Sequence, residues 1–302
     1  MHFRVTHQTK YQYGEPARDS FGELRVRPLE TPYQKIVSRE LQIEPQTTVE
    51  RYQDYFGNEV EFFSLPFLHR KLSVRSTTEV ITHAQSLSEE LLTVPVGDVR
   101  QILNPRRWEI FDYLQTSFHV HLKAIPLSLR KKFCHPNSSL REALLEVNTW
   151  IYENFLYQSG VTDVNTSVAD LLQKKAGVCQ DFSHLMLALL RANGLPARYV
   201  SGYIEPHDPT QPGHDLVGAA ASHAWVEVAL PGGQWWGLDP TNNQITGERH
   251  IKVAVGRDYR DVTPLRGSYQ GGGEQEMSVK VDISRLSSPS PSPRTRTLCS
   301  SL

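Results

Sequence analysis

Cysteine is scarce in this chain. Three residues, Cys134, Cys179 and Cys299, are spread over 302 positions. An odd number of distant thiols, with no Cys-x-x-Cys pair, supports neither a disulfide framework nor a zinc knuckle. Free thiols persist in reducing compartments, so a cytoplasmic location is expected. No acidic cluster resembles an EF-hand loop, and no metal or other cofactor is expected.

Long apolar runs and blocks of one charge are also missing. The first residues have no apolar signal core, and no segment approaches the length of a membrane span. Lys and Arg total 32, Asp and Glu total 33, and the formal net charge is −1. Membrane-surface and nucleic-acid binding are therefore not expected. The length allows one large or two medium domains with sizeable cores.

Short alternating segments fill the first part of the chain. They are residues 2–13, 20–27, 35–43, 47–55, 59–64 and 72–82. Many short strands without a helical run predict a β-sandwich-like domain over residues 1–85. Prolines break residues 86–135 into pieces, which we interpret as a helical linker region. Residues 136–285 are expected to form a second domain, and the Ser- and Pro-rich residues 286–302 a disordered tail.

One stretch places a cysteine where a loop turns into a helix. After Cys179, apolar residues recur at three- and four-residue spacing: Phe182, Leu185, Met186, Leu189 and Leu190. Asn193 and Gly194 end the predicted helix. The unpaired N–H groups and the dipole of a helix N-terminus stabilise a thiolate. This position favours a nucleophile over the usual role of a free cysteine, which is that of a small buried apolar residue.

A predicted β-hairpin downstream supplies a base and a carboxylate. Residues 222–230 alternate, with His223, Trp225 and Glu227 on one face, and residues 235–238 form the returning strand. If the turn centres near residues 231 to 232, position 223 lies opposite positions 239 to 241, which puts His223 beside Asp239. Alone, Asp239 could be a turn residue before a proline, and His223 a structural histidine. Together with Cys179 they supply a nucleophile, a base and an orienting group.

These motifs resemble the catalytic core of the transglutaminase-like superfamily, a papain-like group with a Cys-His-Asp triad. The matching segments are residues 177–182, 223–227 and 239–241. Residues 11–13, 24–28 and 54–58 resemble the β-rich N-terminal region of bacterial members, some of which are named as cysteine proteases. The resemblance covers roughly residues 1–285. It implies an α+β protein in which a β-sandwich-like domain precedes a papain-like domain, whose nucleophile helix packs on an antiparallel sheet.

The resemblance implies thiol-dependent acyl transfer through a thioester, with Cys179 as nucleophile, His223 as general base and Asp239 as its partner. The acyl group would come from a glutamine carboxamide or a peptide carbonyl. A protein or peptide substrate and a primary amine are the expected partners. A cysteine protease or amidohydrolase on the same triad is the alternative, and a non-catalytic protein-binding module is a further one. Substrate and oligomeric state are not indicated.

Several supporting roles stay open. Acyl transfer needs an oxyanion hole, and beside the backbone N–H of Cys179 the second donor could be Gln173 or the hydroxyl of Tyr157. Either residue could equally be structural. Trp225 either walls the substrate cleft or packs on the sheet. Cys179, His184 and His223 could bind a metal instead, but structural zinc has four ligands and no fourth is evident. The polar loop of residues 207–218, which contains His214, is expected to lie near the site.

Overall fold

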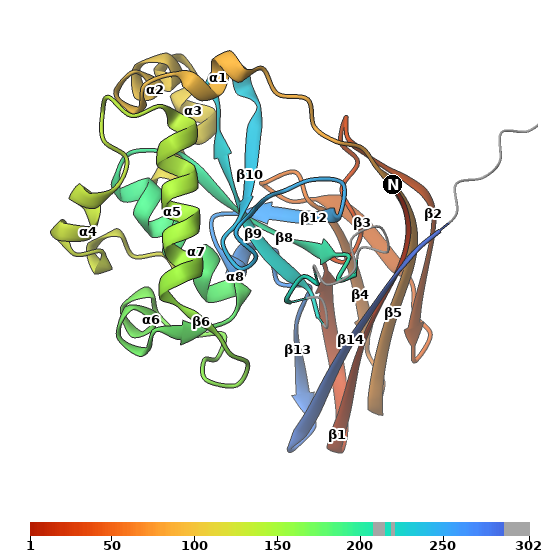
Figure 1. The fold of residues 1–302 in the computed structure, drawn as a ribbon. Helices are drawn as coiled ribbons and strands as arrows, with labels where there is room; N and C mark the ends of the chain where they lie inside the picture. The colour runs from red at the N-terminus through yellow and green to blue at the C-terminus, as the bar shows by residue number, and fades with distance from the viewer. Residues whose placement is uncertain (208–214, 219–220, 287–302) are drawn as a thin grey trace, which may run out of the picture.

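The computed structural model describes residues 1–207, 215–218 and 221–286. Figure 1 shows the helices on the left and the long strands of the N-terminal region on the right. The α+β class predicted from the sequence is confirmed. His214, Cys299 and residues 287–302 of the predicted tail lie outside the described residues. No helix in the described part of the chain is long and apolar enough to cross a membrane.

The N-terminal region is built on one long strand, β1 (His2–Leu24), which pairs with β5 (His69–Thr82) and β4 (Glu59–Leu65). With β2 (Gln34–Glu44) and β3 (Val49–Gln53), the order is β2-β5-β1-β4-β3. The β1–β5 register shifts between Gln12 and Ala17, so β5 follows the first half of β1 and β4 the second. A core cluster joins the two halves, with Ile43, Leu72 and Val74 from one and Leu24, Phe63 and Leu65 from the other. The sandwich-like packing predicted from the sequence is therefore present, although the strands form one hydrogen-bonded sheet.

Two late strands complete this sheet. β13 (Leu265–Gly271) and β14 (Gln275–Arg285) both run antiparallel to β1, and Figure 1 shows the blue β14 beside the red β1. The second domain predicted over residues 136–285 included both of these strands. Alternation shows that a segment is a strand and does not show which sheet it joins. The structure places residues 265–285 in the N-terminal sheet.

The part of the chain that carries the predicted residues Cys179, His223 and Asp239, named the catalytic part after that prediction, contains a second sheet with the order β11-β10-β9-β8-β12. All its neighbouring pairs are antiparallel. The strands are β8 (Ala197–Ile204), β9 (His223–Ala229), β10 (Trp235–Asp239), β11 (Gln244–Ile245) and β12 (His250–Gly256). Helix α7 (Cys179–Ala192) packs on it, because Leu185, Leu187 and Leu189 share a core with Val226 and Val228 of β9. The nucleophile helix thus begins at the predicted residue and lies on an antiparallel sheet.

Helices and helical turns of 3 to 15 residues accompany α7. They are α1 (Glu89–Thr93), α2 (Val96–Leu103), η1 (Asn104–Arg106), α3 (Arg107–Ile110), η2 (Phe111–Leu114), η3 (Leu122–Ala124), α4 (Leu127–Lys132), α5 (Leu140–Asn154), α6 (Val168–Lys174), η4 (Pro231–Gly233) and α8 (Tyr259–Val262). A capping box begins α5, since Ser139 and Glu142 each accept the other's backbone N–H at 3.2 Å. Leu92, Val99 and Ile110 join the core of α7, so the predicted linker region also forms part of the catalytic core.

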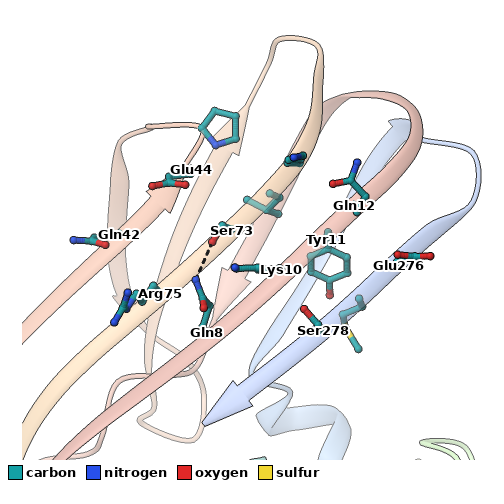
Figure 2. Close-up of a pocket in the computed structure, with 14 residues that line it drawn as sticks. Gln8, Lys10, Tyr11, Gln12, Gln42, Glu44, Ser73, Arg75, Glu276 and Ser278 are labelled. Carbon is teal, nitrogen blue, oxygen red and sulfur yellow. Dashed lines mark hydrogen bonds between the residues drawn. The ribbon is translucent and has the colours of Figure 1, made fainter. Parts of the chain in front are cut away.

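The outward face of the N-terminal sheet carries a polar hollow of about 700 Å³ (Figure 2). Gln8, Lys10 and Gln12 line it and alternate along β1 with buried residues such as His7. Gln8 Nε2 donates to Ser73 Oγ at 3.5 Å across its floor. Because buried Phe3 and Val5 share a core with α7, this hollow faces away from the catalytic part.

Side-chain amides join the two sheets along β12, an edge strand that pairs with β8. Asn58, which is fully buried, donates to the Val255 carbonyl at 2.8 Å and accepts from the Val255 N–H at 2.7 Å. Gln34 does the same for Lys252, at 2.7 and 2.8 Å. The N-terminal region thereby satisfies backbone groups that a further strand would otherwise pair.

We predict that Asn58→Ala lowers the free energy of unfolding by about 3 kcal/mol, because it leaves two buried backbone groups of Val255 unpaired. Urea denaturation measures this loss. Gln53→Ala, which removes an exposed amide bonded to Glu59, is the control and should change stability by less than about 0.5 kcal/mol. Equal effects of the two substitutions would contradict the assigned role of Asn58.

Candidate active site

Cys179 is the first residue of α7 and is 8% exposed. The chain reaches it through β7 (Ala176–Gly177), which pairs in parallel with β6 (Leu156–Tyr157). The buried Asp181 carboxylate accepts from the Val178 N–H at 2.9 Å and from Thr162 Oγ1 at 2.7 Å, so it caps the helix start. A Cβ at Gly177 would lie 2.7 Å from Asp181 Oδ2, which explains the glycine. The N–H groups of the first turn have no partner within the helix.

The predicted hairpin brings His223 and Asp239 together. In the β9–β10 ladder Leu238 lies opposite Val226, and this register extends to place His223 diagonally across from Asp239. His223 Nε2 lies 2.8 Å from Asp239 Oδ2, and the two residues are 1% and 0% exposed. The contact expected from the sequence is therefore present in the structure.

The Cys179 thiol lies close enough to the His223 imidazole to raise its pKa. Because Nε2 contacts Asp239, Nδ1 is the ring nitrogen available to the sulfur, and this buried nitrogen has no hydrogen-bond partner among the described residues. The imidazole thus contacts the carboxylate through one nitrogen and leaves the other available to the thiol.

Electrostatics favour a protonated His223. Burial by itself lowers the pKa of this imidazole, but the charge and hydrogen bond of Asp239, with a smaller effect of Cys179, raise that pKa to about 10. Burial opposes ionisation of Asp239, yet His223 and His250 hold its pKa well below the usual range. Because folding raises the pKa of His223, its protonation stabilises the folded protein against unfolding. This contribution to the free energy of unfolding is complete below the ordinary pKa of about 6.5 and is lost as the pH rises through about 10. The arrangement therefore favours an imidazolium next to Cys179 at neutral pH.

Asp239 has further donors that the sequence analysis missed. Its Oδ1 accepts from the Thr241 N–H at 2.9 Å and the Asn242 N–H at 3.3 Å. Its Oδ2 accepts from Asn242 Nδ2 at 2.8 Å and from His250 Nε2 at 3.4 Å. Asn242 stands three residues after Asp239, so its place in the same turn was a usable signal. The sequence held no comparable signal for His250, which lies on β12. Strands β8 and β9 separate β12 from β10, the strand of Asp239.

Asn242 also holds the segment that covers His223. Its side chain accepts from the Val217 N–H at 2.8 Å and donates to the Val217 carbonyl at 3.3 Å. The next residue, Gly218, has a φ of +97°, and a Cβ there would lie 2.6 Å from His223 Nδ1. This described end of the 207–218 loop thus lies against the imidazole, as the sequence predicted for the loop.

The remaining candidates, Tyr157, Gln173 and Trp225, differ in how far they are buried. Tyr157 is half-buried, and its pKa is raised by burial and by the nearby Cys179. Gln173 is an exposed residue of α6. Trp225 is 1% exposed and packs with Val200 and Val255, which favours its packing alternative over a cleft wall.

His184, considered as a metal ligand, has other contacts. Its Nε2 accepts from the Tyr259 N–H at 3.2 Å, and its ring stacks on His119 at 5.0 Å. Within residues 1–207, 215–218 and 221–286, no group of three or more His, Cys, Asp and Glu side chains is arranged to hold a metal ion.

Two family models match the chain. The Transglutaminase-like superfamily matches residues 128–240, and the bacterial transglutaminase-like N-terminal region matches residues 3–81. An uncharacterized protein of Mycobacterium leprae is 36% identical over 283 residues, which cover 94% of this chain and 98% of that protein. An uncharacterized Mycobacterium tuberculosis protein is 35% identical over 304 residues, with 93% and 92% covered. Both relatives therefore match this chain over nearly its whole length and theirs.

Two further matches carry functional names. A protein-glutamine gamma-glutamyltransferase of Pseudomonas aeruginosa is 31% identical over 152 residues, which cover 49% of this chain and 22% of that protein. The crystal structure of a candidate cysteine protease from Cytophaga hutchinsonii superposes with a TM-score of 0.74 at 27% identity, covering 96% of this chain and 92% of that one.

We predict that iodoacetamide alkylates Cys179 at pH 6 at least about 100-fold faster than Cys134. The imidazolium of His223 faces the Cys179 thiol, whereas burial raises the pKa of Cys134 to about 12. Peptide mapping by mass spectrometry after timed alkylation measures both rates. Equally slow reaction of both thiols would contradict the ion pair.

We predict that Gly218→Ala slows alkylation of Cys179 by about tenfold, because the added Cβ displaces the imidazole that supports the thiolate. Gly160→Ala is the matched control: its φ of +81° imposes similar backbone strain, but no atom lies within 4 Å of its added Cβ. Both variants are compared by alkylation rate and urea denaturation. A tenfold effect in both variants would show that strain alone is responsible.

Proposed function

The chain belongs to the transglutaminase-like superfamily, and on that premise we propose that it catalyses thiol-dependent acyl transfer on a glutamine carboxamide or a peptide carbonyl. The observation that carries this proposal is the buried 2.8 Å contact of His223 with Asp239, which leaves His223 Nδ1 without a partner near Cys179, the first residue of α7. A buried histidine–carboxylate pair holding a cysteine at a helix start is the arrangement that activates a thiol nucleophile.

The first half of the reaction forms a thioester. The Cys179 thiolate attacks the carbonyl carbon and gives a tetrahedral oxyanion. The carbon–nitrogen bond then breaks, and His223 transfers its Nδ1 proton to the departing ammonia or amine. Asp239 keeps the ring oriented through Nε2 and stabilises the imidazolium before this transfer.

The second half releases the acyl group. A primary amine or a water molecule attacks the thioester carbonyl, and the neutral His223 takes a proton from it. The carbon–sulfur bond breaks, and the thiolate is restored beside the imidazolium. An amine gives transamidation and water gives hydrolysis, so both outcomes share one triad. The name of the Pseudomonas relative supports the first outcome, and that of the Cytophaga protein supports the second.

The oxyanion needs donors near the sulfur. The backbone N–H of Cys179 is one, because it lies at the first position of α7. We propose the hydroxyl of Tyr157 as the second, since its pKa responds to Cys179, whereas Gln173 is exposed on α6. The expected partners are a protein or peptide substrate and a primary amine, and the cytoplasmic location stays a prediction.

We predict that Cys179→Ala abolishes turnover of a glutamine-containing peptide while the protein stays folded. The protein is incubated with the peptide, with and without a primary amine, and the products are identified by mass spectrometry. An amine adduct on the peptide identifies transamidation, and deamidation or backbone cleavage alone identifies a hydrolase.

Cys134→Ala is the matched control for this experiment, because it removes a buried thiol outside the triad. It should turn over the peptide at the wild-type rate. Product formation by Cys179→Ala at the same rate would contradict the proposed mechanism.

A further inference from the structure

A second histidine contacts the carboxylate of the proposed triad. His250, the first residue of β12, is 7% exposed and lies with Nε2 3.4 Å from Asp239 Oδ2. The same oxygen accepts from His223 Nε2 and Asn242 Nδ2. Trp225 packs edge-on against the His250 ring, with centroids 5.3 Å apart. Packing and hydrogen bonds therefore both fix this ring.

The hydrogen bonds of His250 define its tautomer. Its Nδ1 accepts from the Gly247 N–H at 3.2 Å, and a nitrogen that accepts carries no proton. The ring proton is therefore on Nε2, where it donates to Asp239. His250 can serve as a donor only in this neutral tautomer, since a proton on Nδ1 would break the bond from Gly247.

Surrounding groups keep His250 neutral. Burial lowers its pKa, Asp239 opposes this effect, and the charges of His223 and Arg249 lower the pKa further. The net direction is downward, opposite to that of His223. Two imidazoles thus share one carboxylate oxygen, and the positive charge belongs to the one that faces Cys179.

The N-terminal region fixes the strand that carries His250. Gln34 and Asn58 hold Lys252 and Val255 of β12 by paired backbone hydrogen bonds. Thr82 Oγ1 donates to the Glu248 carbonyl at 2.7 Å, just before the strand. Contacts from three N-terminal segments therefore determine where His250 lies relative to Asp239.

We propose that His250 is a positioning residue of the acyl-transfer site, a neutral Nε2–H donor that orients Asp239, and that the N-terminal region acts on the reaction by holding β12. This inference rests on the proposed function for its role in turnover. The effect of His250 on the Cys179–His223 pair does not depend on the proposed function and can be measured without an acyl substrate.

The experiment compares His250→Leu and His250→Gln in the full chain. Leucine removes the donor, whereas the glutamine amide can place an N–H near the position of Nε2. His69→Phe is the matched control, because it removes a buried histidine bonded to Ser20 in the N-terminal sheet. The rate of Cys179 alkylation by iodoacetamide is measured from pH 4 to 8, and urea denaturation measures the stability of each variant.

We expect the rise of the alkylation rate with pH to move upward by about 0.5 to 1 pH unit in His250→Leu, which is a three- to tenfold loss at a fixed acidic pH. Without the His250 donor the Asp239 carboxylate loses its fixed orientation toward His223 Nε2, so it holds the imidazolium less well and the thiolate forms at higher pH. His250→Gln should recover most of the shift, and His69→Phe should show none. A merely structural role would lower stability and leave the pH profile in place, which would overturn the proposal.

Nitrogen NMR of histidine-labelled protein tests the tautomer independently. His250, assigned by its loss in His250→Gln, should show a proton on Nε2 and none on Nδ1 between pH 5 and 8. A doubly protonated ring, or a proton on Nδ1, would overturn the proposal. A shifted alkylation profile without turnover of any peptide would support the role of His250 at the thiol and count against acyl transfer, so the two failures are distinguishable.

Discussion

The buried charge of Asp239 governs the arrangement of the catalytic part. A carboxylate with no exposed surface is unfavourable unless charge and hydrogen bonds compensate it. The compensating donors come from β9, from the turn after β10 and from β12. Because these segments are separate in the chain, the carboxylate is satisfied only when the sheet is complete. Folding of the sheet and assembly of the site are therefore one event, and a partly formed sheet has no triad.

The N-terminal region takes part in that assembly. β12 is an edge strand, and edge strands expose backbone groups that attract other chains. Here two amide side chains occupy those groups, and Trp225 fills the space between the catalytic sheet and residues Leu29 and Phe56. The two sheets are accordingly parts of one cooperative structure. Gln34 and Asn58 therefore tie the N-terminal sheet to β12 by hydrogen bonds at two separate points of that strand.

Much of the fold and site follows from local sequence patterns. The start of α7, the capping box of α5 and the β9–β10 register depend on residues within about one turn or hairpin, and these were predictable. The position of His250, the packing of Trp225 and the pairing of β14 with β1 depend on chain-distant partners. Alternation looks the same in either sheet, and a histidine eleven positions from an aspartate has no distinctive spacing. The pattern of apolar residues between 89 and 132 likewise does not indicate whether the segment is an exposed linker or packs into the core.

The pairing of β1 with β13 and β14 has a consequence for the order in which the protein is made. β1 is synthesised first, but its partners along one edge, β13 and β14, emerge roughly 240 to 280 residues later. Translation at about 5 to 20 residues per second leaves that edge without its partner for tens of seconds. During this interval the nascent chain presents a long strand edge of the kind that pairs with other chains. A truncated chain that ends before residue 265 lacks β13 and β14, so this edge of β1 stays unpaired and the product is prone to aggregate.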